Sequence, residues 1–395
     1  MQYRKMKDGT EVSILGYGCM RFTASAGRIN LEKSEKEVML AIENGVNYFD
    51  TAYIYGGSEE ALGTILERNH CRDRVQIATK LPYYLLKNAG SVEKLFQEQL
   101  KRLRTDHIDF YLMHMLFDVE VWNRLKSIGI EEWIAEKKKT GAIRNIGFSF
   151  HGDTDTFKAL IDTYDWDFCQ IQYNYLDEHT QAGRAGLLYA TEKGIPVIIM
   201  EPLRGGRLVE GLPDSAKKAI AEYPLKRTPA QWAFHWLWDQ PQVTCVLSGM
   251  NSTQMITENI ASADEAGIGF FTKADHHLID ILRQKINQNL KVGCTGCGYC
   301  MPCPHGVDIP TAFRCYNQSA AQKKLSAMLE YAQVTSLKKD SSAMTQCTKC
   351  GACEKHCPQH IEIRKELQNA KKTLQPFYIR ALLKIVGRLV KRESA

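Results

Sequence analysis

Eight short apolar segments separated by amphipathic stretches fill residues 1 to about 270, and they constrain the fold more than any other feature. The apolar segments are VSILGYGCM, NYFDTA, VQIATKL, IDFYLMHM, RNIGFSF, DFCQIQYN, PVIIMEPL and VTCVLSGM. Short buried strands alternating with helices, such as SVEKLFQEQLKRLRT, indicate parallel strands in βαβ units. Eight such units predict a (β/α)8 barrel. A doubly wound sheet is the alternative, but it would carry a Gly-rich phosphate loop in its first turn.

Cysteines are concentrated in two runs near the end of the chain. Eight of the 13 cysteines fall there, in the order Cys294, Cys297, Cys300, Cys303 and Cys347, Cys350, Cys353, Cys357, and each run ends in Cys-Pro. Three cysteines at two-residue spacing followed by Cys-Pro are typical of ligands to cubane iron–sulfur clusters. A structural zinc site is the alternative, but it usually pairs two CxxC motifs across a longer loop.

The sequence divides into four segments. We expect a barrel over 1–272, a linker helix over 273–290, a cysteine-rich domain over 291–365 with helices between its runs, and a basic amphipathic tail over 366–395. The N-terminus is polar and no apolar segment approaches the length of a membrane span, so the cysteines are expected in a reducing cytoplasm.

The positive charge of the chain lies in its tail. From residue 364 onward the sequence contains nine Lys and Arg and two Glu, which gives a local charge of +7, while the whole chain carries +6. We therefore infer no nucleic-acid partner from the overall balance. The tail could be a helix that contacts a membrane surface or a partner. The favoured interpretation is a helix packed on the protein itself, or a solvated basic segment.

Four polar residues stand at the predicted C-terminal ends of the second, third and fourth strands. They are Asp50, Tyr55, Lys80 and His114. Active-site groups of such barrels sit at this end. A buried Lys and Asp on adjacent strands are expected to form an ion pair, because an unpaired buried charge is costly. A tyrosine beside that lysine would have its phenolate favoured, which makes Tyr55 a candidate proton donor, and His114 could hydrogen-bond the same oxygen.

These four residues resemble the Asp-Tyr-Lys-His tetrad of the aldo-keto reductases. The segments GYGCMRF, FDTAYIYGGSEEALG, IGFSFH, QIQYN and SGMNSTQMITEN are similar to that family as well. The resemblance implies a (β/α)8 fold and reversible hydride transfer between NAD(P)H and an aldehyde or ketone. Tyr55 would be the general acid/base, Lys80 and Asp50 would tune it, and His114 would orient the carbonyl.

The same resemblance implies a nicotinamide site. Ser149 and Gln170 match the residues that hold the carboxamide. The Lys and Arg that many members use for the 2′-phosphate are Gly249 and Met255 here, so NAD(H) is as compatible as NADP(H). Met200 stands where the family often has a stacking aromatic residue. The predicted cofactor contacts are Gly18, Met20, Asp50, Ser149, Gln170, Glu201, Pro202, Leu203, Ser248, Gly249, Glu258 and Asn259.

The cysteine-rich segment resembles the bacterial two-cluster ferredoxins, in which the fourth cysteine of each run ligates the other cluster. The resemblance implies two [4Fe-4S] clusters with crossed ligands. One would use Cys294, Cys297, Cys300 and Cys357, and the other Cys347, Cys350, Cys353 and Cys303. The first run has two residues rather than three before its last cysteine. A small, mostly α-helical ferredoxin-like domain should therefore follow the α/β barrel.

Two functions fit this combination. The first is an iron–sulfur oxidoreductase that acts on a small carbonyl or alcohol, with clusters relaying electrons to a ferredoxin-like or flavoprotein partner. Hydride carries two electrons and a cluster passes one, so a flavin usually mediates, yet the sequence holds no flavin motif. The second is an electron-transfer or redox-sensing protein whose barrel binds nicotinamide or flavin with little carbonyl turnover. The intact tetrad favours the enzyme, and purely structural clusters remain a third reading.

Overall fold

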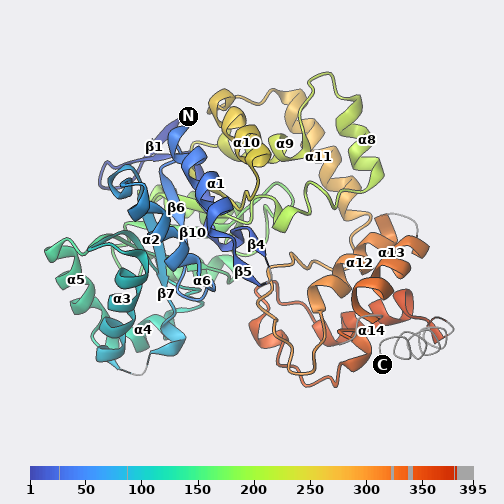
Figure 1. Cartoon of the computed structure of the whole chain (residues 1–395). Coiled ribbons are helices and arrows are strands. Elements are labelled where there is room, and N and C mark those ends of the chain that lie inside the picture. The colour runs from blue at the N-terminus through green and yellow to red at the C-terminus, as the bar shows by residue number, and fades with distance from the viewer. Residues whose placement is uncertain (26, 87, 322–323, 337–340, 378, 380–395) are drawn as a thin grey trace. The chain divides into compact units, whose positions relative to one another are not determined.

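A computed structural model describes residues 1–25, 27–86, 88–321, 324–336, 341–377 and 379, and its larger part is a closed barrel of eight parallel strands (Figure 1). The strands follow one another around the barrel in sequence order, and the last pairs with the first. This confirms the predicted (β/α)8 fold. The strands are β3 (Leu15–Gly18), β6 (Tyr48–Asp50), β7 (Gln76–Leu81), β8 (Ile108–Met113), β9 (Ile143–Phe150), β10 (Phe168–Gln172), β11 (Val197–Met200) and β12 (Val243–Ser248).

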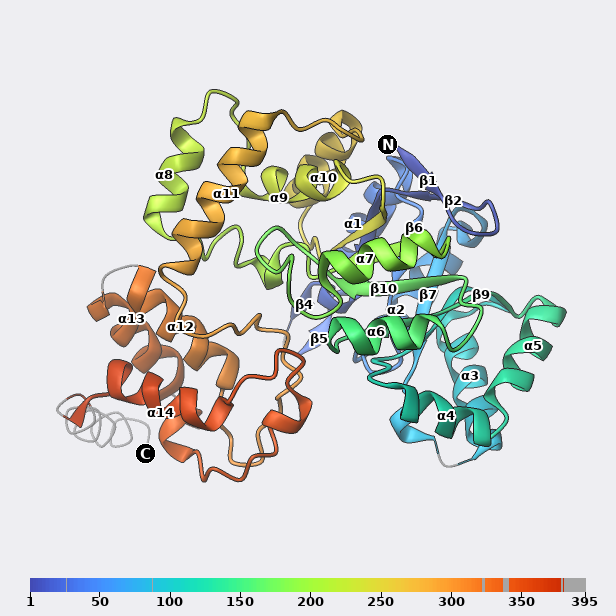
Figure 2. The same ribbon diagram turned by 180° about the vertical axis from the view of Figure 1, so that it is seen from behind.

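Helices cover the outside of this barrel, most of them through one buried apolar face, whereas α9 is buried on all sides over Trp232–Trp238. In Figure 2, α6 and α7 lie side by side over the strands. Polar caps set where several helices begin: Asn30 accepts a hydrogen bond from the backbone N–H of Lys33, and Asn88 and Ser91 form a capping box. The helices are α1 (Leu31–Glu43), α2 (Ser58–Arg68), α3 (Ala89–Leu103), α4 (Val119–Ser127), α5 (Ile130–Thr140), α6 (Thr154–Ile161), α7 (Gly183–Glu192), α9 (Pro229–Trp238) and α10 (Thr253–Glu265).

Two short hairpins were not predicted. One joins β1 (Tyr3–Lys5) to β2 (Glu11–Ser13), and the other joins β4 (Ala24–Ser25) to β5 (Arg28–Ile29). Both contain exposed polar residues and are only two or three residues long per strand, so they lack the apolar signal that marked the barrel strands.

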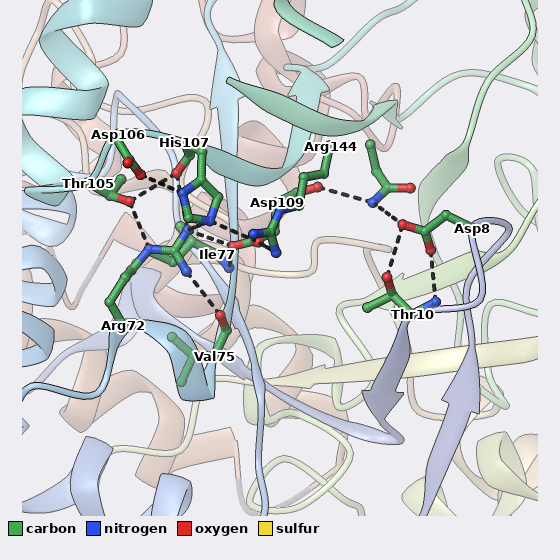
Figure 3. Close-up of polar contacts among 11 residues, drawn as sticks. Asp8, Thr10, Arg72, Val75, Ile77, Thr105, Asp106, His107, Asp109 and Arg144 are labelled. Atoms are coloured by element: carbon green, nitrogen blue, oxygen red, sulfur yellow. Dashed lines mark hydrogen bonds and ion pairs between the residues drawn. The ribbon is translucent and has the colours of Figure 1, made fainter. Parts of the chain in front are cut away.

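A buried carboxylate joins three strands near their N-terminal ends (Figure 3). The side chain of Asp109 is fully buried at the start of β8. Its Oδ2 accepts hydrogen bonds from Arg72 Nη2 at 2.8 Å and from the backbone N–H of Ile77 at 2.9 Å, and its Oδ1 accepts from Arg144 Nη1 at 2.8 Å. Asn145 also donates to Asp8, 3.1 Å away, in the turn of the first hairpin. The carboxylate therefore links β7, β8 and β9 at this end of the barrel.

The remaining residues form a second compact unit, which comprises Leu203–Ala230 and the chain from Lys273 onward. Its helices are α8 (Asp214–Glu222), α11 (Lys273–Asn287), α12 (Ile309–Ala321), α13 (Lys324–Tyr331) and α14 (Ile363–Leu374). α8 packs on α11, and Tyr223 Oη donates to Asp275 Oδ1 at 2.9 Å. Helices α12 and α13 lie between the two cysteine runs, as the sequence predicted.

One apolar core supports the cysteine-rich part of this unit. Val307, Phe313, Tyr331 and Leu367 are almost fully buried in it, and cysteines of both runs pack against it. The predicted basic amphipathic tail over 366–395 starts within α14, and residue 378 and residues 380–395 of it lie outside the described residues. Among the helices that the structure describes, none has both the length and the apolar character needed to cross a membrane.

Loss of the Asp109 carboxylate should destabilise the barrel. The change Asp109→Ala leaves Arg72 and Arg144 without this partner and removes the acceptor of the Ile77 N–H, so we expect about 3 kcal/mol lower free energy of unfolding. All six tryptophans, at 122, 133, 166, 232, 236 and 238, belong to the barrel unit, so urea unfolding followed by tryptophan fluorescence measures this unit.

The matched control is Asp106→Ala, whose carboxylate is 95% exposed and contacts only the ring of the neighbouring His107 among the ion pairs described. It should change stability far less, because exposed ion pairs contribute little. Equal losses in the two variants would contradict a structural role for the buried carboxylate.

Candidate functional site

The four predicted catalytic residues meet at the C-terminal end of the barrel. Asp50 ends β6, Lys80 lies near the end of β7, His114 follows β8, and Tyr55 lies in the loop between β6 and α2. Lys80 Nζ donates to Asp50 Oδ1 at 2.6 Å and to the carbonyl oxygen of Thr51 at 2.8 Å. The lysine is 1% exposed, so its charge is held by these oxygens rather than by water.

Tyr55 lies beside this ion pair. Lys80 Nζ is 5.1 Å from the centre of the Tyr55 ring. The ring of His114 meets the Tyr55 ring edge-on, with 6.0 Å between their centres and an angle of 87°. The half-buried tyrosine is thus flanked by a cation and a histidine.

Burial decides the charge of the histidine. Desolvation lowers the pKa of His114 well below its ordinary value, and the positive charge of Lys80 lowers it further. At neutral pH the imidazole is therefore neutral and can donate one hydrogen bond. Burial raises the pKa of Asp50, and the pairing with Lys80 offsets only part of this rise. The charge of Lys80 favours the ionised form of Asp50, which accepts the hydrogen bond from the lysine.

Several buried polar atoms around this site have no hydrogen-bond partner within the described residues. They are Asp50 Oδ2, His114 Nδ1 and Gln170 Oε1. Buried polar atoms are rarely left unpaired, so these atoms suit a bound polar molecule. Ser149 Oγ accepts from the backbone N–H of Met115 at 2.8 Å, which leaves its hydroxyl proton free to be donated elsewhere. The atoms present therefore fit the carboxamide and hydroxyl groups of a nicotinamide nucleotide.

Of the other predicted cofactor residues, Gly18, Ser248 and Asn259 lie together where the first and last barrel strands adjoin. Gly18 pairs with Asp50 in register, and a Cβ at Gly18 would lie 3.4 Å from the carbonyl oxygen of Ser248. Asn259 Nδ2 donates to Ser248 Oγ at 3.1 Å. Glu258 is exposed on α10 and accepts from Gln254, while Glu201 follows β11 with a φ of +57°. Pro202 belongs to the barrel unit, and Leu203 belongs to the second unit.

A cavity of about 410 Å³ opens beside Tyr55. The half-exposed Met20 and the buried Cys19 line it, together with Arg28 of the second hairpin. The neighbouring Arg21 packs its aliphatic stem over Gly249, where a Cβ would lie 2.9 Å from its Cδ. Neither arginine was singled out from the sequence, although Arg21 directly follows Met20 in the quoted segment GYGCMRF.

A buried hydrogen-bond chain beyond β9 was also missed. His151 Nδ1 is 3.3 Å from Gln181 Oε1, Gln181 donates to Gln172 Oε1 at 3.1 Å, and Gln172 donates to Asp177 Oδ2 at 3.2 Å. Burial lowers the pKa of His151, its contact with Gln181 offsets part of this shift, and the resulting pKa is about 4. The positive form of His151 would lower the pKa of His114, so the two histidines are electrostatic neighbours. His151 is the last residue of the segment IGFSFH, but nothing in the sequence indicated that it contacts Gln181.

The eight cysteines of the two runs line two separate pockets in the second unit. One pocket is lined by Cys294, Cys297, Cys300 and Cys357. The other is lined by Cys303, Cys347, Cys350 and Cys353. In each pocket three cysteines come from one run and the fourth from the other. Ile309 lines both pockets, so they adjoin across this side chain.

The chemistry of these thiols suits a metal cluster. Burial raises the pKa of Cys300 to about 12, and the nearby Cys294, Cys297 and Cys357 raise it too. Burial likewise raises the pKa of Cys353 to about 11. Such thiols stay protonated at neutral pH unless a cation binds them, and metal binding then displaces their protons. Four sulfurs around one pocket fit a cubane cluster.

Comparison with known proteins agrees with both parts of the chain. The model of the aldo/keto reductase family matches residues 14–280, about two thirds of the chain. The chain belongs to the aldo/keto reductase family. Residues 293–362 match the model of a 4Fe-4S dicluster domain. The protein is therefore an oxidoreductase of this family with an iron–sulfur domain attached, as predicted from the tetrad and the cysteine runs.

Individual relatives cover the barrel. A probable aldo-keto reductase 1 of Glycine max is 27% identical over 64% of this chain and 82% of its own. The L-galactose dehydrogenase of Arabidopsis thaliana is 28% identical over 65% of this chain and 86% of its own. Among solved structures, an aldo/keto reductase from Klebsiella pneumoniae in complex with NADP and acetate has a TM-score of 0.57 and 25% identity, covering 70% of this chain and 94% of that one.

The lowered pKa of His151 gives this aldo/keto reductase a defined pH dependence of stability. The unfolded chain binds a proton at this side chain near pH 6.5, and the folded chain binds it only near pH 4. The unfolded state gains protons first as the pH falls, so the free energy of unfolding should drop by about 3 kcal/mol between those values.

The change His151→Asn should remove this part of the pH dependence, as measured by urea unfolding at pH 7, 6, 5 and 4 followed by tryptophan fluorescence. The exposed His70 offers the control His70→Asn, which should keep the wild-type slope. Identical slopes for wild-type and His151→Asn would show that His151 is not buried in its neutral form.

Proposed function

We propose that this aldo/keto reductase reduces an aldehyde or ketone with a nicotinamide cofactor and that Tyr55 is its general acid. The observation that carries the proposal is the buried ion pair of Lys80 and Asp50 beside Tyr55. A lysine charge next to a tyrosine favours the phenolate, which is the form that remains after the proton has been given away. A purely structural ion pair would not need a half-buried tyrosine next to it.

Each residue has a separate task in the proposed reaction. The bound nicotinamide would supply a hydride to the carbonyl carbon. Tyr55 Oη gives its proton to the carbonyl oxygen as negative charge develops there, and Lys80 stabilises the resulting phenolate. His114 is neutral and donates a hydrogen bond to the same oxygen, which fixes the orientation of the carbonyl. Asp50 holds Lys80 in position.

The cofactor is proposed to be NADP(H) or NAD(H). The orphaned Gln170 Oε1 and the Ser149 hydroxyl would hold the carboxamide. A reductase of Klebsiella pneumoniae with 24% identity to this chain was solved in complex with NADPH. The cations of the family's phosphate site are replaced by Gly249 and Met255, and Arg21 packs over that glycine. We propose that Arg21 supplies the positive charge on this side of the cofactor.

The second unit is proposed to hold two [4Fe-4S] clusters. Cys294, Cys297, Cys300 and Cys357 would bind one, and Cys303, Cys347, Cys350 and Cys353 would bind the other, as their pockets support. Bound clusters pass single electrons. Two of them, adjoining across Ile309, would together hold the two electrons of one hydride equivalent, once a flavin-containing partner has taken up the hydride, released its proton to water and passed the electrons on singly. An external ferredoxin-like or flavin-containing partner is the proposed exchange partner.

Replacing the acid should separate proton transfer from electron transfer. In Tyr55→Phe, reduction of a simple aldehyde by NADPH should fall by about 100-fold or more, because general acid catalysis is lost. With a flavin present as mediator, anaerobic addition of NADPH should still bleach the visible absorption of the clusters in this variant, because cluster reduction needs no proton from Tyr55.

The control for this experiment is Tyr53→Phe, since the ring of Tyr53 packs on Arg102 and its contacts, among those described, do not include Lys80, so turnover should be unchanged. Unchanged turnover in Tyr55→Phe would refute the acid assignment. Bleaching without any aldehyde turnover in the wild type would favour an electron-transfer or sensing protein, and turnover without bleaching would make the clusters structural.

Crossed ligation of the clusters can be tested by counting iron. Two cubanes give about eight iron atoms per chain, and Cys357→Ala should lower this to about four because Cys294, Cys297 and Cys300 lose their fourth ligand. Anaerobic iron analysis and electron paramagnetic resonance (EPR) of the reduced protein measure the result. The buried Cys315 lines neither pocket, so Cys315→Ala should keep about eight. Stoichiometric zinc in the wild type would refute the cluster assignment.

A further inference from the structure

Two arginines from the loop after β11 contact the first cysteine run. The loop contains a short 3-10 helix, Arg204–Gly206, and belongs to the same compact unit as the cysteines. Arg204 is 5% exposed, and its Nη2 donates to the carbonyl oxygen of Gly293 at 3.1 Å. This buried contact fixes the loop against the backbone that leads into Cys294.

Arg207 reaches the sulfur itself. Its Nη2 donates to Cys294 Sγ at 3.8 Å, and its Nη1 donates to the carbonyl oxygen of the same residue. A Cβ at Gly296 would lie 3.4 Å from Nη2, so the guanidinium lies close along the run. Gly296 has a φ of +76°, a conformation that glycine adopts without strain. The Arg207 guanidinium is therefore held against one proposed cluster ligand by two hydrogen bonds.

The other pocket has a different electrostatic environment. Arg364 lines it, with its guanidinium carbon 3.5 Å from the position of a Cβ at Gly351. This arginine forms an ion pair with Glu354, with 2.7 Å between Nη2 and Oε2 and 2.8 Å between Nε and Oε2. The carboxylate offsets part of the charge that Arg364 brings to this pocket. Among the contacts described, Arg364 makes no hydrogen bond to a sulfur.

Charge and hydrogen bonds at the sulfurs control the reduction potential of a cluster. Reduction adds one negative charge, and a nearby cation stabilises the reduced form more than the oxidised form. An N–H···S hydrogen bond acts in the same direction because it draws electron density away from the thiolate. The contacts of Arg207 therefore favour the reduced state of the cluster that they touch.

We propose that Arg207 raises the reduction potential of the cluster held by Cys294, Cys297, Cys300 and Cys357 above that of the other cluster. An electron that enters the second unit then resides first on this cluster. The inference rests on the ligand sets of the proposed function. Arg207 would act through the cluster ligand Cys294, and the difference in reduction potential would set the direction of electron flow between the two clusters.

The test is a redox titration of the full-length protein by EPR, in the wild type and in Arg207→Gln. Glutamine removes the charge, so the potential of one cluster should fall by at least the 59 mV that correspond to a tenfold change for a one-electron couple. The signal that moves should be the one that is missing in Cys357→Ala. The other signal should stay in place.

Two further variants make the result specific. Arg207→Lys keeps the charge, so its potential should lie closer to the wild type than that of Arg207→Gln. The control Arg283→Gln removes a cation from α11, which lines neither pocket, and should move neither signal. If Arg207→Gln loses its cluster on purification, Arg207→Lys decides: loss of the N–H···S hydrogen bond should lower the same potential, and a rise of that potential, or a shift of the other signal instead, would overturn the proposal.

The outcomes separate this inference from the proposed ligation. Unchanged potentials in Arg207→Gln with about eight iron atoms per chain would overturn the inference and leave the ligation intact. Equal shifts of both signals would also overturn the inference, because Arg207 would then affect the two clusters alike. A wild-type protein that binds no iron would instead refute the ligation on which the inference rests.

Discussion

A lysine and an aspartate that are both almost fully buried have to face each other, and the candidate site is arranged around that requirement. Lys80 and Asp50 sit at the same end of neighbouring barrel strands, 2.6 Å apart. Removing two charges from water costs several kcal/mol per ion, and only close pairing with added hydrogen bonds repays it. Lys80 therefore stays fixed against Asp50 and the carbonyl of Thr51, and its field acts on Tyr55 and His114 from a constant position.

The barrel was readable from the sequence because its strands are buried on both faces. β8 is entirely buried, and such strands appear as continuous apolar runs bounded by polar residues. The tetrad could be recognised for a related reason: polar and charged residues are uncommon at the ends of apolar segments, so those found there are candidates for function. The family resemblance named the tetrad, and the structure places its four members together. Their catalytic roles remain a proposal.

What the sequence did not indicate depends on contacts between distant segments. Arg207 and Cys294 are 87 residues apart, and neither local sequence predicts a contact between them. The chain from His151 through Gln181 and Gln172 to Asp177 uses residue types that are common on any surface. The loop and helix over Leu203–Ala230 lie within the predicted barrel segment, yet their contacts join them to the second unit. Periodicity cannot reveal such assignments, because they are made by tertiary packing.

The crossed arrangement of the cysteine pockets has a consequence for how iron is loaded. With the proposed ligands, each cluster ties residues on both sides of the segment 304–346 together and closes that segment into a loop. Closing a loop costs chain entropy, and most of this cost falls on whichever cluster assembles first. The second cluster then binds a segment that is already closed. Assembly becomes cooperative through the chain alone, so a chain with a single cluster should hold it less tightly than a chain with both, even though the two clusters share no cysteine.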